Sequence, residues 1–221
     1  MKYFLFVITA LVVFSCSSAP PPKTFSVDLN SRSYEAGEIE AYLDRYLAIG
    51  SLKKTPFNVS YYPDEDAVCL QFKVRYLIYC HQFWDRKGRD AFVAAFRRYQ
   101  EDFEQKKLVK GNRKTRDVYG TVLGFFAWKK TLVSAQAKGS PKVSFGYQFK
   151  DKSVFFTTTQ GEARYEDPIT MDRSQTSPVL LMYFTRAQAE SLAELFSQEF
   201  LQGLGKPGTG TGGNAAELDR Y

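Results

Sequence analysis

Few residues of this 221-residue chain belong to the types that act as nucleophiles or ligate transition metals: it has one histidine and three cysteines. Every second residue from Val68 to Cys80 is apolar, which predicts one strand that contains both Cys69 and Cys80. Side chains an odd number of positions apart on a strand face opposite sides. These two would lie ~36 Å apart, whereas a disulfide needs Cα atoms within ~7 Å. We therefore predict two free, buried thiols.

His81 follows Cys80 directly, so on a strand the imidazole and that thiol point to opposite faces and cannot act as base and nucleophile. The chain has no HExxH, CxxC, GxSxG, P-loop or dinucleotide-binding pattern. Asp64-Glu65-Asp66 lacks the spaced ligands and the glycine of a calcium loop, and we expect a solvated turn there. We predict no catalytic residue, no metal site and no cofactor, and we favour a non-enzymatic role.

The third cysteine, Cys16, follows a stretch with the composition of an export signal. Lys2 gives a positive start, and residues 4–14 are apolar apart from Thr9. A helix needs ~20 apolar residues to cross a bilayer, so this stretch is too short and instead has the length of the apolar part of a signal peptide. Residues 17–23 after the cysteine are polar and rich in proline.

Val13-Phe14-Ser15-Cys16 resembles the lipobox of bacterial lipoproteins, in the relaxed form that is typical of spirochaetes. The resemblance implies that residues 1–15 are removed, that Cys16 becomes the lipidated, palmitate-bearing N-terminus, and that residues 16–23 form a tether. An uncleaved anchor and cleavage by the ordinary signal peptidase are the alternatives. All three readings export the body of the protein, which we expect to face the periplasm or the cell surface.

The charge of the chain is concentrated in its middle. Residues 73–152 carry 19 Lys and Arg against 7 Asp and Glu, a local net charge of +12, while the rest of the chain carries −6. The densest basic run is the predicted contact for an anionic partner and consists of Lys106, Lys107, Lys110, Arg113, Lys114 and Arg116. Export makes nucleic acid an unsuitable partner. Anionic lipid headgroups, an acidic glycan, an envelope protein, or simple solvation of the charges stay open; the oligomeric state is not indicated.

Three stretches have the features of helices. Ile39, Tyr42, Leu43, Tyr46 and Leu47 follow helical spacing, as do the aromatic residues within 85–108. Thr185 and Gln188 form a capping box before a helix that reaches Gly203. Alternating or apolar stretches predict strands at 57–61, 68–80, 118–137, 143–149, 154–159 and 179–184.

These elements predict an α+β fold, mainly an antiparallel sheet with about three helices packed against it. Residues 24–204 are expected to form a single domain, and the Gly-rich tail 205–221 is expected to be disordered. The function that follows is a membrane-anchored binding or structural module of the cell envelope. A hydrolase of the envelope with a dispersed active site is the alternative.

Overall fold

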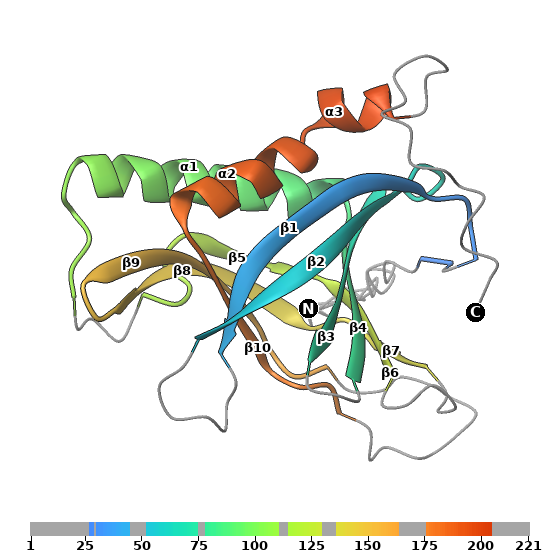
Figure 1. Ribbon diagram of the computed structural model, residues 1–221, viewed down its shortest axis with the longest axis horizontal. Helices are drawn as coiled ribbons and strands as arrows, with labels where there is room; N and C mark the ends of the chain where they lie inside the picture. The colour runs from blue at the N-terminus through green and yellow to red at the C-terminus, as the bar shows by residue number, and fades with distance from the viewer. Residues whose placement is uncertain are drawn as a thin grey trace, which may run out of the picture.

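A computed structural model of the chain describes residues 27–28, 30–44, 52–74, 78–110, 115–129, 136–163 and 176–204 (Figure 1). Several predicted features lie outside these residues: the signal peptide, Cys16 and its tether, the basic residues Arg113 and Lys114, and the tail 205–221. No helix among the described residues is long and apolar enough to cross a membrane.

The described part of the chain forms ten strands and three helices. The strands before the first helix are β1 (Tyr34–Asp44), β2 (Leu52–Tyr62), β3 (Ala67–Val74) and β4 (Ile78–Trp84). After helix α1 (Arg86–Glu104) come β5 (Gly120–Leu123), β6 (Phe125–Lys129), β7 (Ala137–Gly139), β8 (Lys142–Lys150), β9 (Ser153–Gln160) and β10 (Leu180–Phe184). Helices α2 (Arg186–Leu195) and α3 (Gln198–Gly203) end the described chain.

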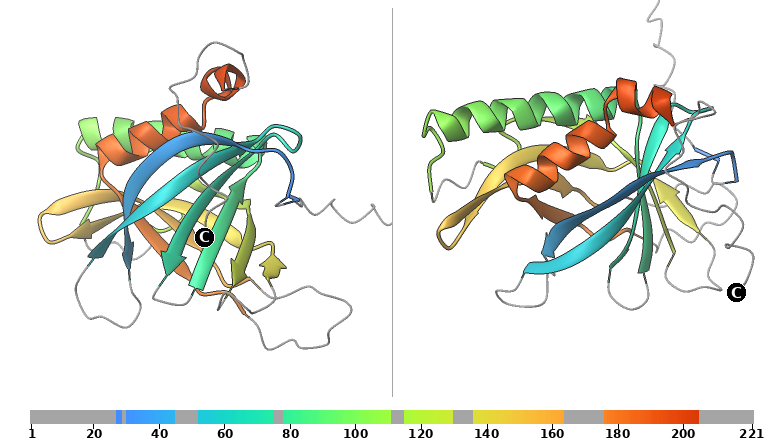
Figure 2. Two further views of the ribbon diagram at one scale, coloured as in Figure 1. Left: turned by 45° about the vertical axis from the view of Figure 1, so that its right-hand side comes forward. Right: turned by 45° about the horizontal axis from the view of Figure 1, so that its top comes forward.

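All ten strands belong to one sheet in the order β5-β8-β9-β10-β1-β2-β3-β4-β6-β7, and every pairing is antiparallel. The sheet curls into a half-barrel, and α1 and α2 lie across it (Figures 1 and 2). The face that packs against these helices is called the inner face here, and the opposite face the outer face.

The prediction of an α+β fold is wrong. Strands make up 49% of the structure and helices 24%, so the protein is a sheet-dominated half-barrel with short helices. The described part of the expected helix over Ile39–Leu47, residues 39–44, belongs to strand β1, which runs beside β2 from Tyr34 to Asp44, and residues 45–47 lie outside the described residues. Apolar residues at 39 and 43 suit both a helical and a strand period. Ala41, which is fully buried between them, makes the inner face of a strand.

The predicted single strand over 68–80 is a hairpin of β3 and β4. Phe72 pairs with Cys80 and Cys69 pairs with Phe83, so the two cysteines lie on neighbouring strands. Helix α1, strands β8, β9 and β10 and the Thr185 capping box are confirmed at their predicted places. The last predicted helix is broken into α2 and α3, because Ser197 caps a new helix start.

A bent hairpin joins the two edges of the sheet. Gly124 alone separates β5 from β6, and Ser140 with Pro141 separates β7 from β8. β5 pairs with β8 and β6 pairs with β7, so residues 120–129 and 136–145 form the two arms of one long hairpin whose halves lie at opposite ends of the strand order. Gly124 N–H donates to the Pro141 carbonyl over 2.9 Å. A Cβ at Gly124 would lie only 3.0 Å from Val143, so glycine suits the bend.

The core lies between the inner face and the helices, and Phe92 of α1 is at its centre. The Phe92 ring is fully buried, and five rings, from four strands and the C-cap of α2, lie with centroids 5.2–6.1 Å from it. These rings are Trp84, Phe145, Phe156, Phe184 and Phe196. One side chain of α1 therefore contacts both halves of the sheet and the end of α2.

A buried charge holds the start of α1. Arg89 is 1% exposed and its guanidinium pairs with the Asp66 carboxylate at 2.8 Å, donates to the Asp66 carbonyl and reaches Gln198 at 3.1 Å. The contacts connect the β2–β3 turn, α1 and α3. Removing one partner of such a buried pair leaves an uncompensated charge, which destabilises more than the pair itself stabilises.

Phe92→Ala is expected to lower the free energy of unfolding by about 3–5 kcal/mol, because it leaves a cavity among five rings. Urea unfolding followed by circular dichroism measures the change. Asp90→Ala, at an exposed position of the same helix, is the control and is expected to change stability by less than ~0.5 kcal/mol. Equal effects of the two substitutions would contradict the central place of Phe92.

Candidate functional site

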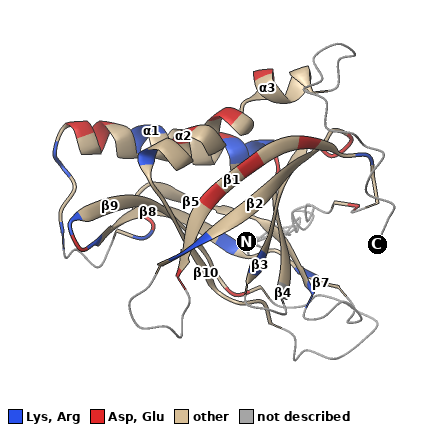
Figure 3. Ribbon diagram, in the orientation of Figure 1, with Lys and Arg blue, Asp and Glu red and all other residues tan. Residues whose placement is uncertain are grey.

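The predicted basic residues that the structure describes gather at the C-terminal end of α1. Lys106, Lys107 and Lys110 follow the helix, and Arg116 is the second residue of the next described segment. The structure adds two cations from the β8–β9 turn, which sequence reasoning did not include in the site (Figure 3). We call this set the basic end: Lys106, Lys107, Lys110, Arg116, Lys150 and Lys152.

The β8–β9 turn meets the chain after α1 through direct hydrogen bonds. Lys106 has φ +54°, which ends the helix, and Val109 N–H then donates to the Tyr147 hydroxyl over 3.2 Å. The Lys110 ammonium donates to the Asp151 carbonyl over 2.9 Å. Lys110 is thereby held beside Lys150 and Lys152, although about forty residues separate them in the sequence.

The segment that carries Arg116 is fastened to β8. Tyr147 N–H donates to the Thr115 carbonyl over 2.9 Å, and Tyr119 N–H donates to the Phe145 carbonyl over 3.0 Å. Gly146 makes this crossing possible, since a Cβ there would lie 1.9 Å from the Thr115 carbonyl oxygen. Gly146 lies within the alternating pattern of residues 143–149. A glycine inside a strand pattern can indicate a close approach of another backbone segment, so the sequence contained a signal for this crossing.

The same segment is also tied to α1. The Tyr119 hydroxyl donates to the Asp102 carboxylate over 2.9 Å, and the Arg98 guanidinium lies 5.6 Å from the Tyr119 ring centre. Burial of the ring, followed by the hydrogen bond and charge of Asp102, raises the pKa of Tyr119 well above its usual range. Tyr119 therefore stays protonated and donates at any physiological pH.

Behind the basic end, Tyr183 joins three strands on the outer face. Its hydroxyl lies 3.2 Å from the Asp44 carboxylate and 2.9 Å from the Gln148 side-chain oxygen. The Lys150 ammonium is 3.6 Å from Asp44 and 5.1 Å from the Tyr183 ring centre. Burial, and then the charge of Asp44, raises the pKa of Tyr183, while Arg116 opposes this shift. Lys150 thus has its own carboxylate partner.

Five cations of the basic end form no ion pair with a carboxylate of the described residues, and Lys110, one of them, donates to a carbonyl instead. Lys106, Lys107, Lys152 and Arg116 are exposed, and none forms an ion pair with a carboxylate of the described residues. Acidic residues do lie nearby, because Glu101 and Glu104 are on the last turn of α1 and Asp151 is in the β8–β9 turn (Figure 3). The arrangement offers exposed ammonium and guanidinium groups to an anionic surface, with acidic residues beside and between them.

A Cys–His contact exists on the outer face, and sequence reasoning missed it. The Cys69 sulfur lies 3.9 Å from Nδ1 of His81, because the two residues are on the neighbouring strands β3 and β4. Burial raises the pKa of the Cys69 thiol and lowers the pKa of His81. Both groups are therefore neutral at pH 7, and this pair lacks the thiolate that nucleophilic catalysis needs.

The described residues contain no group of three or more His, Cys, Asp or Glu side chains that could hold a metal ion. Cys80 lies on the inner face within the main core, away from Cys69 on the outer face. Both described cysteines are buried and free. Their opposite orientation was predicted correctly, although the strand arrangement behind that prediction was not.

A model of the family described as Uncharacterised Treponema protein matches residues 21–203. Since the match covers most of the chain, the protein belongs to this family, which supports the spirochaete source that the lipobox indicated. No curated protein and no solved structure matches the chain. Function is therefore inferred from the geometry and charge of this protein itself.

Gly146→Ala is expected to detach the Thr115–Tyr119 segment from β8, because the added methyl group would occupy the place of the Thr115 carbonyl. The expected loss in the free energy of unfolding is about 1–3 kcal/mol, as for other overpacking substitutions. Limited trypsin digestion should cut the variant faster at the basic end. Gly203→Ala, where an added Cβ meets nothing within 4 Å, is the control, and equal digestion of all three proteins would contradict the crossing.

Cys69 and Cys80 are expected to resist a chromogenic thiol reagent at pH 8 in the folded protein, because burial raises the pKa of both thiols. Both should react fully in denaturant without a reductant. A chain that begins after Cys16 keeps the count at two thiols. Absence of reaction in denaturant would mean that a disulfide joins them and that the β3–β4 register is wrong.

Proposed function

We propose that the protein is an exported lipoprotein, anchored to a bacterial membrane through Cys16, whose folded body is a binding or structural module of the cell envelope. The basic end is the proposed contact with an anionic surface. The observation that supports this function is the collection, at one end of the molecule, of cations from three separate segments, five of which lack an ion-pair partner in the described part of the chain.

Lipid headgroups are the partner we favour for the basic end. Each cation near an anionic membrane contributes ~1 kcal/mol, so four free cations contribute ~4 kcal/mol, enough to assist an acyl anchor but weak alone. An acidic glycan or an acidic envelope protein offers the same charge. A vesicle assay separates these partners from a membrane, because its vesicles present lipid headgroups but no glycan and no other protein.

The start of the described domain and the basic end lie near opposite ends of α1. The start of the described domain is fastened to the β2–β3 turn by the hydrogen bond from Ser31 to Glu65, and Arg89 binds that turn to the first turn of α1. The basic end follows the last turn of α1 (Figure 1). Helix α1 has 19 residues and is therefore ~28 Å long. The chain from Cys16 to Ser31 is long enough, at ~3.3 Å per residue, for the basic end to meet the bilayer that holds the proposed anchor.

Lipid attachment is tested by growth with radiolabelled palmitate. We expect the label on the wild-type protein and its loss in Cys16→Ala, because the Cys16 thiol is the proposed acceptor. Ser17→Ala is the control and should keep the label. An unlabelled wild-type protein would contradict the lipoprotein assignment.

Vesicle co-sedimentation of the unlipidated body tests the basic end. We expect binding to vesicles with anionic lipid that weakens steeply as salt rises, since the charges are exposed and screened. Lys107→Glu with Arg116→Glu should reduce binding at least tenfold.

The matched control for this assay is Lys138→Glu with Lys142→Glu, which makes the same change in net charge at exposed positions of β7 and β8. This control should bind nearly as well as the wild type. Equal losses of binding in both variants would mean that only net charge matters. Binding that does not change with salt concentration would contradict an electrostatic role of the basic end.

A further inference from the structure

Strand β1 has an edge that is only partly paired. On one side β2 accompanies β1 from Tyr34 to Asp44, but on the other side β10 pairs only with Tyr42 and Leu43. Strand β10 stops at Phe184, because Thr185 caps α2, and the chain then continues as a helix. Within the described residues, Glu38–Ala41 therefore have no strand on this edge. Free N–H and C=O groups on a strand edge are a template for another strand.

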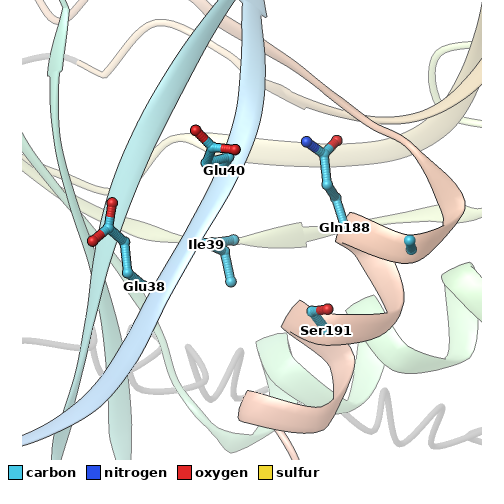
Figure 4. A pocket seen from close by; sticks show the side chains of 6 residues that line it. Glu38, Ile39, Glu40, Gln188 and Ser191 are labelled. Atoms are coloured by element: carbon cyan, nitrogen blue, oxygen red, sulfur yellow. The ribbon is translucent and has the colours of Figure 1, made fainter.

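A groove runs between this edge and α2 (Figure 4). It has a volume of about 360 Å³ and is lined by Glu38, Ile39, Glu40, Ala187, Gln188 and Ser191. One end is bounded by the pairing of Tyr42 with Tyr183, and the other by Leu195, whose side chain lies 3.7 Å from the Cβ position of Gly37. This size falls within the ~300–1,000 Å³ that is typical of ligand sites.

The helix wall of the groove leaves room for a backbone and offers polar groups. Ala187 and Ser191 are small and exposed, and Figure 4 shows Gln188 and Ser191 on the side of α2 that faces β1. The Gln188 side-chain oxygen accepts from Thr185 N–H, so its amide N–H groups stay available as donors. Ile39 directs its side chain into the core, and the strand wall is therefore largely β1 backbone.

The rim of the groove is acidic. Glu38 and Glu40 are exposed and line it, and Figure 3 shows further acidic residues along β1. Glu40 pairs with Lys54 on β2, while Glu38 has no ion pair with a cation of the described residues. A net negative rim favours a cationic ligand, and a free strand edge favours an extended one.

We propose that the groove between β1 and α2 binds an extended segment of a partner protein that carries Lys or Arg at alternate positions. The segment would add to β1 as a strand beside Glu38–Ala41, with main-chain hydrogen bonds for affinity and its cations against Glu38 and Glu40 for specificity. Alternate residues of a strand share one face, which sets the spacing of those cations. This inference is independent of the lipid anchor and of the basic end.

The probes are labelled peptides, with the full chain in a mild non-ionic detergent. Acetyl-Lys-Val-Lys-Val-Lys-amide should bind, as measured by fluorescence anisotropy, and its Glu-for-Lys counterpart should bind at least tenfold more weakly. A version of the Lys peptide with alternate backbone nitrogens methylated should also lose at least tenfold if its N–H groups pair with β1. Equal binding of the methylated and unmethylated peptides would overturn strand addition.

Two variants locate the binding. Ser191→Trp fills the groove from an exposed helix position and should reduce binding of the Lys peptide at least tenfold, whereas Glu190→Trp, an exposed neighbour that does not line the groove, should not. Hydrogen exchange should show slower exchange of amides within Glu38–Ala41 when the peptide is bound. Equal effects of the two tryptophans, or unchanged exchange, would overturn the proposal. So would self-association of the wild type that Ser191→Trp abolishes, because it would assign the groove to a second copy.

Discussion

The bend of one hairpin at Gly124 and Pro141 holds the two edges of the sheet together, and the other features of the molecule depend on it. A strongly twisted sheet of ten strands curls rather than staying flat. Here β5 with β8 and β6 with β7 are halves of one hairpin, so the curl is built into a covalent connection. The curl brings distant strands within reach: Gln82 of β4 donates to Gln160 of β9 over 2.9 Å across the inner face, five places away in the strand order.

Helix α1 crosses the half-barrel and is fastened at both of its ends. These attachments fix the positions of the start of the domain and of the basic end. Arg89 binds Asp66 near its start, and Asp102 accepts from Tyr119 near its end. Between them Phe92 and its ring neighbours make the helix part of the core. The start of the domain and the basic end are thus about one helix length apart, and the proposed membrane contact and the proposed peptide groove use different faces of the same scaffold.

An element was predicted correctly when its apolar residues matched either the helical period or the strand period, but not both. The aromatic spacing of α1 and the alternation of β8 each matched one period only, and both were predicted correctly. Ile39 and Leu43 of the expected helix matched two periods, and pairing of residues 39–44 with β2 decided for a strand. At the candidate site, Lys106, Lys107, Lys110 and Arg116 were identified from local density, whereas Lys150 and Lys152 needed the contact between Lys110 and Asp151.

By itself the sequence determined the local features of this protein: the apolar stretch before Cys16, the capped helix starts at Asp85 and Thr185, and the concentration of positive charge in residues 73–152. Caps and charge density depend on neighbours along the chain, so they are visible without a fold. Only the tertiary structure decided the curl of the sheet, the Cys69–His81 contact and the groove beside β1. Each of these depends on which strands become neighbours, and strand pairing joins residues that are far apart in the sequence.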